Sequence, residues 1–105
     1  MLTRITMIAA VIVLLSLAGG VQAAGSAERG ADLTFDCIEC HGMDGKGSFE
    51  TPSIAGKDQA YLLKRLRGFY SGNRKSIDDI MHIYTEDRTD QDLQDLAAYY
   101  SSLKK

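Results

Sequence analysis

Both cysteines of the 105-residue chain lie in one short stretch, DCIECHGMDGKG at residues 36–47. Cys37 and Cys40 are three positions apart, and His41 directly follows the second cysteine. Two thiols at this spacing beside an imidazole suit three kinds of chemistry: a redox disulfide, part of a zinc site, or the covalent attachment of a c-type haem. The rest of the sequence discriminates between these three.

The disulfide and zinc interpretations find little support. A disulfide between Cys37 and Cys40 would close a very small loop and stabilise the fold little. A redox pair is expected beside a βαβ pattern, and hardly a run of β-branched residues follows the motif. Zinc needs four ligands, yet adjacent Cys40 and His41 cannot easily share one tetrahedral ion, and only His82 or a carboxylate is left. The sequence therefore favours C-x-x-C-H as a haem attachment motif, with two thioether bonds and His41 directed at the iron.

The N-terminus has the pattern of a secretory signal peptide. A lone positive residue, Arg4, precedes an apolar run, and Val21 and Ala23 occupy the −3 and −1 positions of a cleavage site. A retained membrane anchor is the alternative, but about a dozen apolar residues are too few, since a span needs roughly 20. We therefore expect cleavage after Ala23, a periplasmic protein, and no membrane span after cleavage.

The remaining residues, 24–105, are enough for one domain. Cleavage removes one basic residue and no acid, so the net charge of −2 becomes one unit more negative. This balance gives no basic excess that would indicate nucleic-acid binding. A domain of this size buries little apolar surface, so its fold usually needs further stabilisation from a cofactor, a metal ion or disulfide bonds. A haem attached after export would meet that need.

Helical periodicity and capping residues divide residues 24–105 into four predicted helices. The first runs from its N-cap, Ser26, to about Ile38 and leads into the attachment motif. A glycine-rich loop at residues 42–56 holds the only proline, Pro52. The others are a helix capped by Asp58 and ended by Gly72 and Asn73, a short helix over residues 76–86, and a closing helix capped by Thr89.

The closing helix carries an apolar stripe at helical spacing, formed by Leu93, Leu96, Ala97 and Tyr100. No segment has a clear strand pattern. The sequence therefore predicts an all-α domain.

On these residues the sequence resembles the class I bacterial cytochromes c, especially the short c-553 type and single halves of the di-haem cytochrome c4 type. The resemblance covers nearly all of residues 24–105. It rests on ERGADLTFDCIECHGMDGKG, TPSIAG, YLLKRLRGFYSGNRK and TDQDLQDLAAYYSSL. It implies a small cytochrome c fold, with about four helices wrapped around one covalently bound haem c. The first and last helices would cross, with Gly30 and Phe35 against Leu96 and Tyr99.

The resemblance also implies the axial ligands of the iron, His41 and Met81. Met43 is too close to His41 in sequence to reach the opposite haem face. His82 is the alternative sixth ligand, and bis-histidine ligation would lower the reduction potential; otherwise it is a partly exposed surface residue. Met81 could also be a core methionine packed against the ring. The sequence departs from the family at Arg88, where a leucine is common, and in having no proline near Met81.

Two further features have more than one interpretation. The resemblance implies that the carbonyl of Pro52 accepts a hydrogen bond from His41, orienting the imidazole; the alternative is a proline that only stiffens its loop. A basic cluster could dock an acidic partner, pair with the haem propionates, or form a solvated helix face. The cluster comprises Lys64, Arg65, Arg67, Arg74 and Lys75.

With both axial positions filled, the iron has no open position for a substrate, so we expect an electron carrier and not an enzyme. The expected role is a periplasmic monohaem carrier that passes single electrons between respiratory or dehydrogenase partners. A dedicated cytochrome subunit of an oxidoreductase complex, such as a sulfur- or sulfide-oxidising flavocytochrome, is the alternative. A haem-based gas sensor, which would release Met81, is a third hypothesis.

Overall fold

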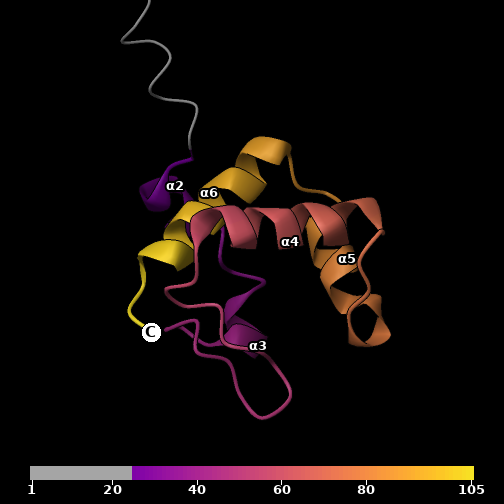
Figure 1. Ribbon diagram of the computed structural model, residues 1–105, viewed down its shortest axis with the longest axis horizontal. Coiled ribbons are helices and arrows are strands. Elements are labelled where there is room, and N and C mark those ends of the chain that lie inside the picture. The colour runs from indigo at the N-terminus through magenta and orange to yellow at the C-terminus, as the bar shows by residue number, and fades with distance from the viewer. Residues whose placement is uncertain (1–24) are drawn as a thin grey trace, which may run out of the picture.

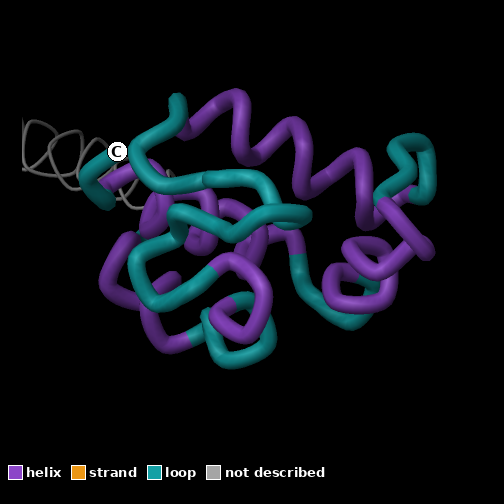
Figure 2. The backbone as a smooth tube through the Cα atoms, turned by 90° about the horizontal axis from the view of Figure 1, so that it is seen from below, coloured by secondary structure: helices purple, strands orange, loops and turns teal. Residues whose placement is uncertain are grey.

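The computed structural model describes residues 25–105, so the predicted signal peptide at residues 1–23 lies outside the described residues. Helices and loops make up this part of the chain, without a strand, as the sequence predicts (Figure 2). The helices are α2 (Ala27–Asp32), α3 (Ile38–His41), α4 (Gln59–Ser71), the 3-10 helix η2 (Ile77–Asp79), α5 (Ile80–Thr85) and α6 (Asp90–Ser102). None of these is both long and apolar enough to cross a bilayer.

The first helix is shorter than predicted. Ser26 caps α2 as expected, accepting a hydrogen bond from the backbone N–H of Arg29. The helix then ends at Asp32 and not near Ile38, and the chain turns before α3 begins. Thr34 explains part of this break, because its hydroxyl donates to the carbonyl of Ala31 at 2.9 Å. Such side-chain bonds compete with continued helical pairing.

α2 and α6 cross at Gly30, as the resemblance implies (Figure 1). A Cβ atom on Gly30 would lie 2.0 Å from the carbonyl oxygen of Asp95 and 2.8 Å from Cβ of Tyr99, so the two backbones meet where only glycine fits. The prediction for Phe35 is wrong, since this residue lies beyond the end of α2 and is 78% exposed.

A buried carboxylate fastens the same crossing. Asp95 is 1% exposed and accepts hydrogen bonds from the backbone N–H of Ser26, from Arg29 and from Gln91. Burial favours the neutral acid, but the hydrogen bonds from Arg29, Ser26 and Gln91 outweigh it and hold the pKa of Asp95 below its usual range. The charged side chain is therefore fully partnered and ties the start of the domain to α6.

The helices α4 and α6 match their predicted boundaries. Asp58 caps α4 by accepting from the backbone N–H of Tyr61, and Gly72 ends it in the left-handed conformation. Thr89 and Asp92 form a capping box at the start of α6. Figure 1 shows α4 lying across α6. The core between them contains the buried side chains of Leu62, Leu96, Ala97 and Tyr100.

The predicted short helix at residues 76–86 is divided in two. Asp79 adopts a positive φ of 54°, which separates η2 from α5. Ser76 still marks the start, because its hydroxyl accepts a hydrogen bond from the backbone N–H of Met81 at 3.0 Å. The buried hydroxyl of Thr85 donates to the carbonyl of Met81 at 2.7 Å. These two bonds hold the backbone of Met81 within α5.

Candidate functional site

The C-x-x-C-H residues share one side of a very short helix. Cys37 caps α3, and Cys40 and His41 follow three and four positions later, which places all three on one helix face. Both thiols are free, with Cys37 half-buried and Cys40 exposed. His41 is 7% exposed. The structure thus presents two unpaired thiols beside a buried imidazole, which gives the disulfide interpretation no support.

The imidazole of His41 is held in one tautomer. Its Nδ1 lies 3.0 Å from the carbonyl oxygen of Pro52, and since a carbonyl can only accept, Nδ1 carries the proton. Nε2 is then left with a free lone pair. Burial lowers the pKa of His41 below its usual value, and the hydrogen bond to Pro52 opposes this effect only in part. A neutral imidazole with a free Nε2 is the form that binds a metal ion.

The glycine-rich loop carries Pro52 back to His41. The backbone N–H of Gly47 donates to the carbonyl of His41 at 2.8 Å, and that of Ser48 donates to Thr51 at 2.9 Å. At the far end of the loop, the N–H of Gly56 donates to the carbonyl of Tyr100 at 2.8 Å. α6 therefore anchors the loop, and the loop orients His41.

Tyr100 ends beside Cys37, a placement that the sequence did not predict. Tyr100 is 4% exposed, and its buried hydroxyl lies beside the Cys37 thiol, a weak partner, without forming a well-aligned hydrogen bond in residues 25–105. Burial is the main cause that raises the pKa of both Cys37 and Tyr100, and each group also acts on the other. A buried hydroxyl that has only a weakly accepting thiol beside it is poorly satisfied. It fits a site where a further group joins Cys37. In the sequence, the position of Tyr100 in the apolar stripe of the closing helix was the only sign that this residue would be buried.

The two methionines of the described region differ in burial. Met81 is half-buried in α5, whereas Met43, two residues after His41, is 78% exposed. This difference favours Met81 over Met43 as the residue available on the inner side of the fold.

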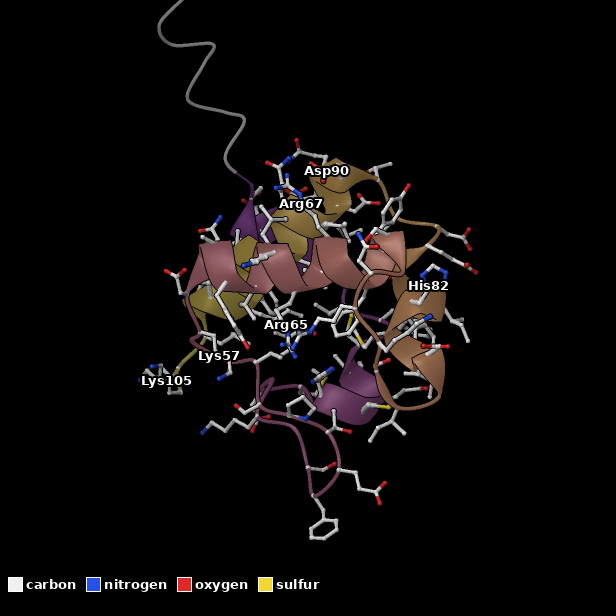
Figure 3. The ribbon with its side chains drawn as sticks, turned by 45° about the vertical axis from the view of Figure 1, so that its right-hand side comes forward. Lys57, Arg65, Arg67, His82, Asp90 and Lys105 are labelled. Carbon is white, nitrogen blue, oxygen red and sulfur yellow. The ribbon has the colours of Figure 1, made fainter. Side chains whose placement is uncertain are left out.

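His82 is engaged elsewhere. Its Nδ1 donates to the carbonyl of Phe69 at 2.7 Å, and its Nε2 lies 3.5 Å from a carboxylate oxygen of Glu86. Figure 3 shows the side chain at the outer side of α5, beside the end of α4. Because Phe69 engages Nδ1 and the ring lies at the surface beside Glu86, this arrangement disfavours His82 as an iron ligand.

Other observations fit a large apolar prosthetic group rather than a bare ion. Within residues 25–105 no three His, Cys, Asp or Glu side chains gather closely enough to hold a metal ion. Several large apolar side chains around α3 and α5 lie partly or fully in solvent, whereas the core cluster is small. These exposed side chains include Met43, Ile77, Ile80 and Ile83. A covalently held haem would cover part of this exposed apolar surface.

The structure divides the predicted basic cluster. Arg67 makes two hydrogen bonds to Asp90, at 2.8 and 2.9 Å, and so joins α4 to α6 (Figure 3). Lys75 lies 3.8 Å from Asp79. The remaining three cations line a surface groove of about 240 Å³, here called the α4 groove. Its lining residues are Tyr61, Lys64, Arg65, Gly68, Asn73 and Arg74.

Comparison with known proteins relates the chain to a single family. The family model for cytochrome c matches residues 27–104. Cytochrome c4 of Stutzerimonas stutzeri is 37% identical over 100 residues, which cover 86% of this chain and 47% of that protein. The cytochrome subunit of sulfide dehydrogenase of Chlorobaculum tepidum is 32% identical over 109 residues, covering 94% of this chain and 97% of the relative.

A solved structure agrees with these matches. The crystal structure of reduced recombinant cytochrome c4 from Pseudomonas stutzeri superposes with a TM-score of 0.71 at 36% identity, covering 77% of this chain and 47% of that one. The chain thus spans about half the length of the cytochrome c4 relatives. The match extends from α2 to the end of α6 and includes the attachment motif. The chain therefore belongs to the cytochrome c family, all-helical proteins that bind haem c covalently.

Proposed function

We propose that this protein is a periplasmic monohaem cytochrome that carries single electrons between redox proteins. Cys37 and Cys40 would hold the haem through thioether bonds, and His41 and Met81 would bind the iron from opposite sides. The observation that carries the proposal is the buried His41 imidazole, whose Nδ1–H is fixed by Pro52 and whose Nε2 is free.

The bound haem supplies one kind of chemistry, the gain or loss of a single electron at its iron. The residues of the chain would hold both iron ligands in fixed positions during that exchange. Pro52 fixes the orientation of His41 and increases its basicity, and Ser76 and Thr85 hold the backbone of Met81. With His41 and Met81 both bound to it, the iron would have no open position for a substrate, so these residues would support electron transfer and not catalysis.

The proposed location follows from the sequence. Residues 1–23 have the pattern of a cleaved signal peptide, and residues 24–105 then form the exported domain. In bacteria, haem is attached to such motifs after export, so the C-x-x-C-H motif supports the same compartment.

The partners would be other redox proteins that dock briefly. The α4 groove supports an acidic partner surface, because Lys64, Arg65 and Arg74 surround it. Arg65 also stacks over the rings of Tyr61 and Phe69, at 5.7 and 5.8 Å from their centroids, which holds its charge in place. Small, wet contacts with charge complementarity are typical of short-lived redox encounters.

A cytochrome subunit of an enzyme complex is the second candidate. It is supported by the relative named as the cytochrome subunit of sulfide dehydrogenase, which this chain covers over 97% of its length. Phe35 and Ile77 are 78% and 75% exposed, and a stable partner could cover them. Purification from the source cells decides between the two: co-purification with a flavoprotein at fixed stoichiometry favours the subunit, and isolation alone favours the free carrier.

Near-infrared and visible spectra of the purified holoprotein test the proposed ligands. We expect a methionine-to-ferric-iron charge-transfer band in the wild type, and its loss in Met81→Ala. His82→Ala is the matched control and should keep the band. A band that survives Met81→Ala shows that another residue is the ligand. Carbon monoxide binding to the reduced wild type at neutral pH would instead favour a gas sensor.

A further inference from the structure

Arg88 connects segments that are far apart in the sequence. It lies in the turn between α5 and α6, and its side chain is only 18% exposed. Its Nη2 donates to the carbonyl of Leu33 at 3.1 Å and lies 3.6 Å from a carboxylate oxygen of Asp36. Leu33 is the C-cap of α2, and Asp36 immediately precedes Cys37. One guanidinium thus holds both ends of the segment that leads into the attachment motif.

This contact matters because α3 has little other support from helices. In the described region, α2 packs with α6, α4 packs with both α6 and α5, and α5 packs with η2. α3 is positioned instead by its flanking loops and by single side chains. The Pro52 loop holds α3 at its C-terminal end, through His41. Arg88 holds the chain just before the N-terminal end of α3, close to Cys37.

The charge of Arg88 also reaches the attachment residue. Burial is the main influence on Cys37 and raises the pKa of its thiol. Tyr100 and then Arg88 lower this pKa, and Asp36 raises it by a smaller amount. The guanidinium is mostly withdrawn from solvent, where charges are screened less than at an open surface. Arg88 is the one cation among the described residues that line the groove beside Cys37, where it faces the carboxylates of Asp36, Asp87 and Asp92 and offsets part of their negative charge.

We propose that Arg88 is a positioning residue of the haem site, which clamps residues 33–36 against the α5–α6 turn and raises the reduction potential through its charge. The inference rests on the proposed haem attachment at Cys37. The ferric iron carries one positive charge more than the ferrous iron. A nearby cation therefore favours uptake of the electron from the donor protein, with no bond or proton changed. Asp36 acts in the opposite direction.

The experiment is a redox titration of purified holoproteins monitored by visible absorption, beside their thermal unfolding. We expect Arg88→Leu to lower both the midpoint potential and the unfolding temperature. Arg88→Lys keeps the positive charge, so its midpoint potential should stay close to that of the wild type. Its unfolding temperature should fall, because lysine cannot reproduce the hydrogen bond to Leu33 in the same geometry. Asp36→Asn, which leaves the bond from Arg88 to Leu33 in place, should raise the potential.

Arg67→Gln is the matched control. It also removes a cation that braces α6, but this side chain is 50% exposed and should shift the potential little. The proposal is overturned if Arg88→Leu leaves the potential unchanged or raises it, or if Asp36→Asn fails to raise it. If Arg88→Leu does not yield holoprotein, the sign of the shift in Asp36→Asn decides. A wild type without covalent haem refutes the proposed function itself, a result distinct from an unshifted potential.

Discussion

At the level of single residues, the state of His41 depends on backbone atoms more than on other side chains. Its Nδ1 partner is the carbonyl of Pro52, and the loop that delivers this carbonyl turns at Gly47. The motif and Pro52 could be identified in the sequence, because haem attachment requires particular residue types at fixed spacing. The contacts of Tyr100 and Arg88 could not, because they depend on how α6 and the α5–α6 turn pack against residues 33–37.

Substitution of Gly47 tests how strongly the loop controls His41. Gly47 has a φ of 74°, and an added Cβ would lie 2.2 Å from the carbonyl oxygen of Thr51 and 2.7 Å from that of Pro52. Gly47→Ala should displace the Pro52 carbonyl, make the imidazole a weaker donor to the iron, and so raise the midpoint potential.

Gly72→Ala is the control for backbone strain alone. Gly72 has a similar φ of 79°, but an added Cβ meets no atom within 4 Å. We expect a loss of about 1–2 kcal/mol in unfolding free energy for Gly72→Ala, with no change in potential. A larger loss is expected for Gly47→Ala. Equal losses and unchanged potentials in both variants would show that the loop does not orient His41.

At the level of helices, local signals were reliable where a cap defines the boundary. Ser26, Asp58 and Thr89 each cap the predicted helix, because the capping side chain and its backbone partner lie within three residues of each other. The break after Asp32 and the division at Asp79 were missed, since both follow from how the chain must turn to meet other elements. The burial of Asp95 was missed for the same reason.

The crossing of α2 and α6 should tolerate no side chain at Gly30. The carbonyl oxygen of Asp95 would lie only 2.0 Å from an added Cβ. This oxygen belongs to the backbone of α6, so relieving the clash would require the helix itself to move. We expect Gly30→Ala to cost at least about 2 kcal/mol in chemical denaturation of the holoprotein. Ala31→Ser, at the exposed neighbouring position of α2, should cost less than about 1 kcal/mol. Comparable costs would mean that the helices do not approach this closely.

The ion pair between α4 and α6 predicts an acid-dependent loss of stability. Hydrogen bonds from Arg67, and then from Gln94, lower the pKa of Asp90 from 3.8 to about 2. Because the folded-state pKa lies below the ordinary value, this contribution is complete above pH 3.8 and is lost as the pH falls toward 2. Thermal unfolding of wild type and Asp90→Asn should therefore converge over that range. A difference that stays constant down to pH 2 would contradict this linkage.

At the level of the whole molecule, the charged groups are unevenly placed. The α4 groove is basic, whereas a second groove of about 430 Å³ is lined by Asp36, Asp87 and Asp92 together with Ile83, Tyr84 and Arg88. The net charge of −2 does not reveal this separation, which needs the fold to appear. The all-α class and the family could be predicted from sequence, because the motif, the proline loop and the closing helix are all local patterns.

This separation predicts how electron exchange responds to salt. The second-order rate with an acidic redox protein should fall as ionic strength rises, because the attraction that steers the encounter is screened over about 10 Å at 0.1 M salt. Lys64→Gln and Arg74→Gln should weaken this dependence, whereas Lys46→Gln in the glycine-rich loop should leave it nearly unchanged. Stopped-flow kinetics measures it, and equal slopes in all the variants would place docking away from the α4 groove.

The mass of the mature protein tests most directly whether this chain carries a haem on Cys37 and Cys40. The protein should be purified from the periplasm of cells that can mature c-type cytochromes, and its intact mass measured under denaturing conditions. The account predicts the mass of residues 24–105 plus one haem, and the bare polypeptide mass when both cysteines are replaced by alanine. A wild-type protein with the bare polypeptide mass would contradict it.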